Sequence, residues 1–327
     1  MHPNMPLQIL LTTTSFQDTP GKHHDVLANS GVEVVRARGP LSEQQVLDLI
    51  AQADGFDGFL NGDDRITARV IDAAFPRLKV IAKYGIGLDS IDVKYATSRR
   101  IPVLFTPGVN ETTVAEHSIG LMIAVAKNFW FHMQAVKQGQ WRRQTGSELY
   151  QKTLGILGLG RIGKEVVKRC GAFGMTCIGH GNHWDDAFAR QYNLERVSTR
   201  EEVLRRADVV SLHMNLTPET RGFINQQTLA LMKPGAILIN TARGGLVVEQ
   251  DVAEACKSGK LLGYGADVLE TEPMKTPHVF QEIDKIIITP HIGSRTNESV
   301  QRQGLRAANN IVNFLNGNPD YVQANPF

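Results

Sequence analysis

A glycine-rich turn between an apolar run and a helix-forming segment constrains the fold of this chain most. Thr153–Gly163 reads TLGILGLGRIG, and its short apolar run is long enough for one buried strand. Gly158, Gly160 and Gly163 follow in the spacing G-x-G-x-x-G, and Lys164–Phe173 is predicted to be a helix. In this spacing the glycines permit a tight turn, close approach of a pyrophosphate and packing of helix on strand. Because helix N-terminal amides attract anions, the segment predicts a dinucleotide-binding unit.

Length and charge exclude several classes of protein. A chain of 327 residues fits two domains of ordinary size. Its 35 basic and 33 acidic residues give a net charge of +2, which offers no electrostatic case for nucleic acid or an anionic membrane. Its three cysteines suit neither a zinc site nor a disulfide framework, and no signal peptide or membrane-spanning run is visible. We expect a cytoplasmic protein without a metal.

The N-terminal third alternates predicted strands with predicted helices. Ser42 and Gln45 have the spacing of a capping box, which marks the start of one helix. Alternation at this pace indicates a parallel sheet with helices on both faces. The strands are expected at Leu7–Leu11, Val32–Val35, Phe56–Leu60, Leu78–Ala82 and Val103–Phe105, with further helices at Gly21–Asn29, Thr67–Phe75 and Ile91–Arg99.

The next segment, Glu111–Asn128, is predicted to be a helix capped by Thr112, and its apolar residues fall on more than one face. Such a helix is buried in a large core or between subunits. We expect it to contribute to a homodimer interface, and a role confined to its own domain stays open. His117 and His132 lie on or beside this helix, and we interpret both as packed or surface histidines.

A second βα series follows the irregular connection Lys137–Tyr150 and the glycine turn. Thr199 and Glu202 have capping-box spacing. The repetition again indicates a doubly wound sheet, and a last helix over Asn297–Leu315 is expected to return to the first domain. Strands are expected at Met175–Gly179, Val209–His213, Ile237–Asn240, Leu262–Ala266 and Ile286–Thr289, and helices at Thr199–Arg206, Gln226–Met232 and Glu249–Ser258.

Chemically capable side chains follow three of these strands. Arg243 lies in the turn NTARGG, where a guanidinium can bind a carboxylate through two hydrogen bonds. Asp267 and Glu272 lie in ADVLETEP, and His291 lies in TPHIG. Histidine is a good acid/base group near neutral pH. Because open α/β sheets bind ligands outside the carboxyl ends of their strands, we expect these residues to share one crevice.

These motifs together resemble the D-isomer-specific 2-hydroxyacid dehydrogenase family, over nearly the whole chain. The resemblance is carried by YGIGLDSID (84–92), TPGVNETTVAEH (106–117), GLGRIG (158–163), LHMNLTPETRGFI (212–224), INTARGG (239–245), ADVLETEP (266–273) and TPHIGS (289–294). It implies two doubly wound α/β domains. A flavodoxin-like substrate-binding domain would comprise residues 1–104 and 293–327, and a Rossmann NAD(P)-binding domain residues 105–292.

The resemblance also implies the chemistry, which is hydride transfer between NAD(P)H and C2 of a small 2-oxo or 2-hydroxy acid. His291 would be the acid/base, Glu272 its hydrogen-bond partner and Arg243 the residue that binds the substrate carboxylate. The substrate-binding set is expected to be Tyr84, Gly85, Ile86, Gly87, Arg243 and His291. The cofactor-binding set is expected to be Gly158, Gly160, Arg161, Ile162, Gly163, Gly181, Asn182, Met214, Thr241, Ala242, Asp267 and Gly293.

Gly181 departs from the pattern of NAD-selective enzymes. Such enzymes place Asp or Glu about 20 residues beyond the glycines, where it binds the ribose 2′-hydroxyl. Gly181 cannot repel a 2′-phosphate, and only Asn182 and His183 are near it in the sequence. We therefore lean slightly to NADP over NAD. An NAD(H)-sensing regulatory protein of the same fold is the alternative, and the Arg–Glu–His set argues against it.

Overall fold

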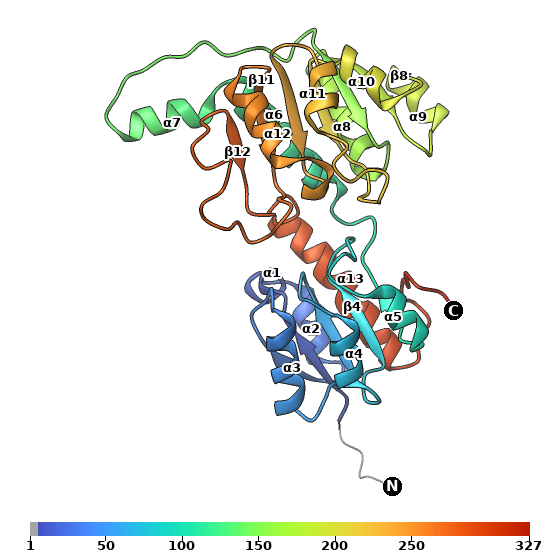
Figure 1. Ribbon diagram of the computed structural model, residues 1–327. Helices are drawn as coiled ribbons and strands as arrows, with labels where there is room; N and C mark the ends of the chain where they lie inside the picture. The colour runs from blue at the N-terminus through green and yellow to red at the C-terminus, as the bar shows by residue number, and fades with distance from the viewer. Residues whose placement is uncertain (1–5) are drawn as a thin grey trace. The chain divides into compact units, whose positions relative to one another are not determined.

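The computed structural model describes residues 6–327 and divides the chain into two units (Figure 1). One unit runs to Asn110 and resumes at Arg295–Phe327, and the other is Glu111–Ser294. The sequence expects the boundaries near residues 104 and 293, and it assigns substrate to the first unit and cofactor to the second. That assignment stays a prediction.

The first unit is built on a five-stranded parallel sheet in the order β2-β1-β3-β4-β5. This is the flavodoxin-like order, in which the direction of winding reverses between β1 and β3. The predicted doubly wound class is therefore confirmed for this part. Its strands are β1 (Gln8–Leu11), β2 (Glu33–Arg36), β3 (Gly58–Asn61), β4 (Val80–Lys83) and β5 (Val103–Leu104).

Alternating side chains of β1 enter two separate hydrophobic cores. Leu10 packs with α3 (Glu43–Gln52), α4 (Ala68–Ala74) and α5 (Val93–Ser98) on one face. Ile9 and Leu11 pack on the other face, which α1 (Thr14–Asp18), α2 (Lys22–Ala28) and α13 (Asn297–Leu315) cover. Both faces of the sheet are therefore buried, as a parallel sheet requires.

Two helices of this unit begin or end as the sequence predicts. Ser42 and Gln45 form the complete capping box at the start of α3, where Gln45 Oε1 accepts from the Ser42 amide at 2.9 Å. The C-terminal helix α13 has the predicted bounds, and its Ala307 and Ile311 are fully buried against the first sheet.

The second unit contains a seven-stranded parallel sheet in the order β12-β11-β10-β9-β6-β7-β8. The winding reverses between β6 and β9, which is the arrangement of a Rossmann sheet. The predicted fold class is confirmed here too. The strands are β6 (Thr153–Leu157), β7 (Thr176–His180), β8 (Leu194–Arg196), β9 (Val209–Leu212), β10 (Ala236–Asn240), β11 (Leu261–Ala266) and β12 (Ile286–Ile288).

Helices cover both faces of this sheet as well. The first face carries α6 (Glu111–Ala126), α8 (Arg161–Ala172) and α9 (Asp186–Gln191). The second carries α10 (Arg200–Arg206), α11 (Gln226–Leu231) and α12 (Glu249–Lys257), and a short 3-10 turn, η1 (Gly244–Leu246), follows β10.

The structure corrects three details of the sequence interpretation. Thr112 lies inside the first turn of α6, which begins at Glu111, so it is not the cap. Thr199 does accept a hydrogen bond from the Glu202 amide at 3.1 Å. The Glu202 carboxylate, however, accepts from Ser198 at 3.1 Å, so this is not the reciprocal box that the spacing predicts. The short edge strand β8 and the helix α7 (Phe129–Lys137) were not expected.

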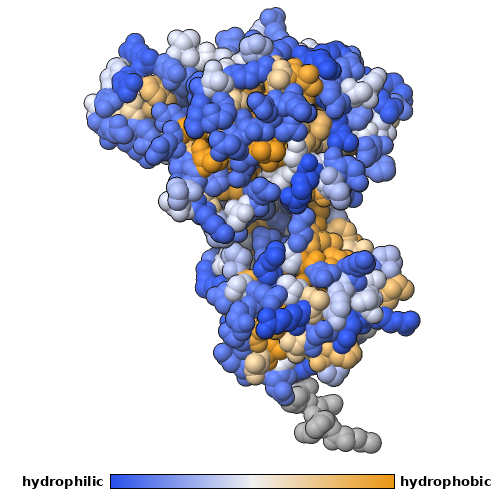
Figure 2. Space-filling model, viewed as in Figure 1, coloured by the Kyte–Doolittle hydropathy of each residue, from blue (hydrophilic) through white to orange (hydrophobic). Residues whose placement is uncertain are grey.

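α6 packs on β10, β11, β12 and α8, so its apolar residues are used largely within its own unit. A group of exposed apolar side chains lies instead on α7, which Figure 1 shows on the β12 side of this sheet. Figure 2 shows that hydrophobic side chains form separate patches on a mostly hydrophilic visible face. Among residues 6–327, no helix is long and apolar enough to cross a membrane.

Candidate functional site

The site residues predicted for the second unit all follow strands at the carboxyl edge of its sheet. Because every strand is parallel, this edge gathers six separate turns on one side of the sheet. In chain order these are Gly158–Gly163 after β6, Gly181 and Asn182 after β7, Met214 after β9, Thr241–Arg243 after β10, Asp267 and Glu272 after β11, and His291 and Gly293 after β12.

The glycine turn has the shape that a dinucleotide needs. Gly158 has a φ of 103°, and a Cβ there would lie 2.4 Å from the carbonyl oxygen of His213. A Cβ on Gly163 would lie 2.3 Å from the carbonyl oxygen of Gly158, so helix and strand pack too closely for any side chain. Around Gly160, by contrast, a Cβ would meet no atom within 4 Å. Gly160 is the N-cap of α8 without a side-chain cap, which leaves room and amide donors for a phosphate.

Gly181 follows β7 beside the glycine turn. A Cβ on Gly181 would lie 3.1 Å from the amide nitrogen of Leu159, so the two turns are in close contact. On the other side of β7, the last residue of β8 is Arg196, which pairs in register with Gly179. Its guanidinium lies 5.5 Å from the centre of the Trp184 ring. The sequence interpretation missed this cation because it lies 15 residues beyond Gly181 and only the sheet brings it near.

Arg243 is presented by a turn that Asn240 shapes. The Asn240 side chain accepts from the Ala242 amide at 3.1 Å and donates to the Arg243 carbonyl at 2.9 Å. The hydroxyls of Thr241 and Ser118 lie 2.7 Å apart and tie the same turn to α6. Arg243 itself is half-buried, and Nη1 of its guanidinium donates to the Ala242 carbonyl at 2.6 Å.

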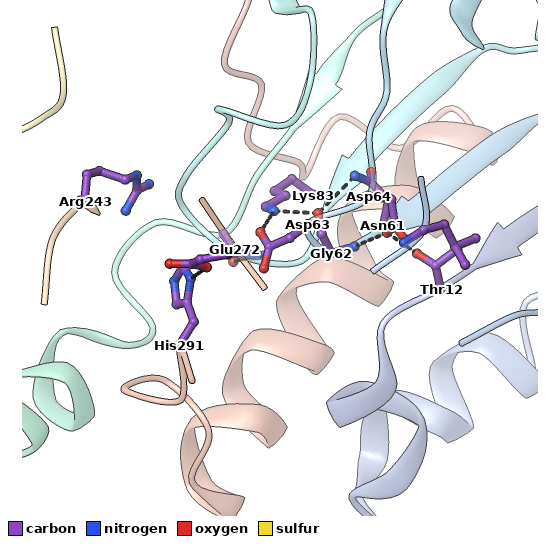
Figure 3. A network of polar contacts seen from close by, with 12 residues as sticks. Thr12, Asn61, Gly62, Asp63, Asp64, Lys83, Arg243, Glu272 and His291 are labelled. Carbon is purple, nitrogen blue, oxygen red and sulfur yellow. Dashed lines mark hydrogen bonds and ion pairs between the residues drawn. The ribbon is translucent and has the colours of Figure 1, made fainter. Parts of the chain in front are cut away.

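His291 and Glu272 are in direct contact, as Figure 3 shows. Nδ1 of His291 lies 2.8 Å from Oε2 of Glu272, and the other carboxylate oxygen accepts from the Leu269 amide at 2.9 Å. Their side chains are 41% and 36% exposed, so the pair is open to a ligand. Arg243 is set apart from the pair in the same view. A histidine oriented by a carboxylate is a common arrangement for proton transfer.

Asp267 holds the turn that carries His291. Its carboxylate accepts from the Ile292 amide at 2.8 Å and the Gly293 amide at 2.7 Å. It also contacts Thr289 and His117, which lie 2.8 Å apart from one another. Burial opposes the charged form, but these hydrogen bonds outweigh it, so the pKa of Asp267 lies below its usual value. This support explains how His291 holds a left-handed φ of 54°.

In the first unit, the predicted substrate loop Tyr84–Gly87 directly follows β4. Gly85 has a φ of 135°, and its amide donates to the Thr106 hydroxyl at 3.0 Å. The preceding Lys83 has a buried ammonium that donates to Asp63 at 2.7 Å and to the Gly62 carbonyl at 2.5 Å (Figure 3). The sequence interpretation noted Lys83 but missed this network, which depends on the pairing of β3 with β4.

A parallel sheet with a glycine turn at its switch point is typical of a dinucleotide-binding α/β protein, and here a Glu–His pair lies at the same edge of the sheet. Residues 119–293 match the family described as "D-isomer specific 2-hydroxyacid dehydrogenase, NAD binding domain". The chain belongs to this D-isomer-specific 2-hydroxyacid dehydrogenase family, as the sequence motifs predict.

Individual relatives agree with this assignment. The chain is 41% identical over 287 residues to a D-3-phosphoglycerate dehydrogenase of Methanocaldococcus jannaschii, which covers 87% of this chain but only 54% of that protein. It is 38% identical to a glyoxylate reductase of Thermofilum pendens, covering 85% and 83% of the two chains. The crystal structure of the TT0316 protein from Thermus thermophilus superposes with a TM-score of 0.88 at 37% identity, over 97% of this chain and 100% of that one. The chain thus spans about half the length of the phosphoglycerate dehydrogenase.

Proposed function

We propose that this protein is an NAD(P)-dependent oxidoreductase that interconverts a small 2-oxo acid and its D-2-hydroxy acid. The observation that carries the proposal is the 2.8 Å contact between His291 and Glu272 at the strand edge that also bears Arg243. Relatives named glyoxylate reductase and hydroxypyruvate reductase support the substrate class. The complete Arg–Glu–His set gives no support to a purely NAD(H)-sensing role.

Each residue has a role that its chemistry suits. Arg243 binds the substrate carboxylate and polarises the carbonyl at C2. His291 donates a proton to the carbonyl oxygen during reduction and removes the hydroxyl proton in the reverse direction. Glu272 orients the imidazole through its contact with Nδ1. The backbone amides of Ile86 and Gly87 are proposed as further carboxylate donors. Tyr84 and Gly85 complete the proposed substrate-binding loop, but their own amides donate to Asn61 and Thr106.

The glycine turn and the other turns of this edge are proposed to hold the cofactor. Its pyrophosphate would lie over Gly160, where the structure leaves space, and against the first amides of α8. NAD(P)H supplies the hydride when it is bound. Arg161, Ile162, Met214, Thr241, Ala242, Asp267 and Gly293 complete the proposed cofactor-binding set.

We propose that NADPH is accepted at least as well as NADH. Gly181 presents no carboxylate to repel a 2′-phosphate, and Arg196 ends the neighbouring strand with a positive charge. Asn182 and His183 are exposed at the same turn and can donate hydrogen bonds.

We also propose that the protein works as a homodimer. α7 exposes Phe129, Trp130, Met133 and Val136 by 45–56%, and Trp141 in the following segment is 78% exposed. Large apolar side chains gathered on one element mark an interaction surface. If a second copy covers α7, Met133→Glu will convert the dimer to monomer in a sedimentation experiment, whereas an unchanged mass would contradict this part of the proposal.

The test of the function is a reduction assay with glyoxylate, hydroxypyruvate, pyruvate and phosphohydroxypyruvate, each with NADH and with NADPH. Oxidation of the reduced cofactor in the presence of one acid, with formation of the D-hydroxy acid, is the expected result. Tight cofactor binding without turnover on a broader panel of 2-oxo acids would contradict the proposal and favour the NAD(H)-sensing alternative.

A further inference from the structure

The loop that carries Glu272 has no helix or strand between β11 and β12, so other contacts must fix its path. Only a fixed loop can hold the Glu272 carboxylate against His291. One point of support is Gly244, next to Arg243. A Cβ on Gly244 would lie 1.9 Å from the carbonyl carbon of Leu269 and 2.3 Å from the amide nitrogen of Glu270. The backbone of η1 therefore lies directly on the peptide that precedes the Glu272 turn.

The second point of support is Glu249, the first residue of α12. Its Oε1 accepts from the Glu270 amide at 2.9 Å, and its Oε2 lies 3.2 Å from Nε2 of His278. The Glu249 and His278 side chains are only 17% and 13% exposed. One carboxylate thus joins two points of the loop, eight residues apart, to the start of a helix whose dipole favours a negative charge there.

The hydrogen bonds also fix which nitrogen of His278 carries the proton. The Phe280 amide donates to Nδ1 of His278 at 3.3 Å, so Nδ1 is an acceptor. The ring proton is then on Nε2, which donates to Glu249. Phe280 is itself buried and packs against Tyr264 of β11. The far end of the loop is therefore connected to Glu249 through a histidine of defined tautomer.

We infer that Glu249 and His278 are positioning residues for the Glu272–His291 pair: they clamp the loop so that the Glu272 carboxylate stays aligned with the imidazole. This inference rests on the proposed function, since it assigns these residues a part in the same proton transfer. Glu249 acts through the backbone amide of Glu270, and His278 acts by joining the far end of the loop to Glu249.

Substitutions can separate the two contacts of Glu249. Glu249→Gln keeps an oxygen for the Glu270 amide but turns an NH₂ group toward the Nε2 proton of His278, so one contact is lost. Glu249→Ala removes both contacts, and His278→Phe keeps an aromatic ring beside Phe280 while it removes the polar ones. Glu254→Gln is the matched control, because Glu254 lies on the same helix, is 60% exposed and pairs with a lysine and a glutamine of that helix.

The experiment measures kcat, KM, the pH profile of kcat and the hydrogen exchange of the Leu269 and Glu270 amides. A misaligned catalytic group costs on the order of 100-fold, so we expect Glu249→Ala to lower kcat by about 10- to 100-fold with KM for cofactor unchanged. Its pH profile should change as that of Glu272→Gln does, and its two amides should exchange faster. Glu249→Gln and His278→Phe should each give a smaller loss of kcat. In the double variant the two losses should not be additive, because both residues act through the same contact.

Unchanged kcat and unchanged amide exchange in Glu249→Ala would overturn the inference, and so would an equal loss in Glu254→Gln. The exchange measurement needs no substrate. If the wild-type protein reduced none of the 2-oxo acids, the proposed function would fail. The exchange rates of the Leu269 and Glu270 amides in Glu249→Ala would still show whether Glu249 holds the loop. If the wild-type protein is active and the Glu249 and His278 variants have the same kcat and amide exchange as the wild type, the inference fails but the proposed function stands.

Discussion

Nδ1 of His291 lies 2.8 Å from Oε2 of Glu272, although 19 residues separate the two along the chain. The remaining oxygen of Glu272 binds the Leu269 amide, so the carboxylate is held on both sides. The turn of His291 is in turn fixed by two amide hydrogen bonds to Asp267. Both partners are therefore positioned before any ligand arrives, which is the arrangement that efficient proton transfer requires.

Replacing His291 with Asn should lower kcat at least about 100-fold on the best 2-oxo acid, because the amide cannot act as the proposed acid/base. Cofactor binding, followed by fluorescence titration, should stay within about 3-fold of wild type. The control is His132→Asn on α7, where Nε2 of the histidine lies 3.1 Å from the carbonyl oxygen of Gln144. Near-full activity of the His291 variant would refute its acid/base role.

Replacing Arg243 with Lys keeps the charge but removes the planar pair of donors that fits a carboxylate. We expect kcat/KM to fall at least about 100-fold, with a matching loss of inhibition by unreactive dicarboxylates. Arg205→Lys, at the exposed end of α10, should have no effect. If Arg243→Lys retained wild-type kcat/KM, the proposed contact with the substrate carboxylate would be wrong.

Gly181→Asp should move cofactor preference toward NADH by at least about 10-fold, since a carboxylate there repels a 2′-phosphate. The new Cβ would lie 3.1 Å from the Leu159 amide nitrogen, so some loss of overall activity is expected. Asn182→Asp adds the same charge one residue later without that contact. The ratio of kcat/KM with NADH to that with NADPH is the measurement, and no change in either variant would mean that the 2′ position of the ribose lies elsewhere.

Gly163→Ala should destabilise the protein by about 1–3 kcal/mol, because its Cβ would lie 2.3 Å from the Gly158 carbonyl oxygen. Gly171 lies on the same helix α8 and is exposed, and a Cβ there would meet no atom within 4 Å. Gly171→Ala should therefore stabilise the protein by up to about 1 kcal/mol. Thermal unfolding of both variants checks the pair, and equal shifts in Tm would contradict the packing argument.

His213, which follows β9 beside the glycine turn, should make stability depend on pH. Burial lowers its pKa from 6.5 to about 4. Between these values the unfolded chain binds the proton and the folded one does not, so the free energy of unfolding falls as the pH drops, by up to about 3 kcal/mol. His213→Gln should flatten this part of the profile in urea unfolding. An identical slope in the variant would mean that other groups cause the dependence.

The pattern of apolar residues along the chain was enough to predict both sheets, because buried parallel strands are short apolar runs that alternate with helices. Capping residues such as Ser42 and Gln45 marked where a helix begins. α7 escaped prediction since its large apolar side chains lie on an exposed face and not against a core. β8 is a three-residue edge strand with two charged residues, which carries almost no strand signal.

The site was harder to predict than the fold. Motifs identified Arg243, Glu272 and His291, and their catalytic roles stay predictions. The contacts that support them could not be read from the chain. Glu249 and His278 meet across an irregular loop, and Arg196 comes beside β7 only through strand pairing. Such contacts depend on the path of loops, which no local pattern encodes.

The helix α13 has a consequence for how this protein is made. It covers the face of the first sheet that carries Ile9 and Leu11, yet it is synthesised almost 290 residues after them. On the ribosome, the strands of the first unit emerge early, but α13 completes their apolar cover only after the entire second unit has been made. Until α13 has emerged, a newly made chain therefore carries a partly bare sheet surface in its first unit, and such a surface is prone to aggregate.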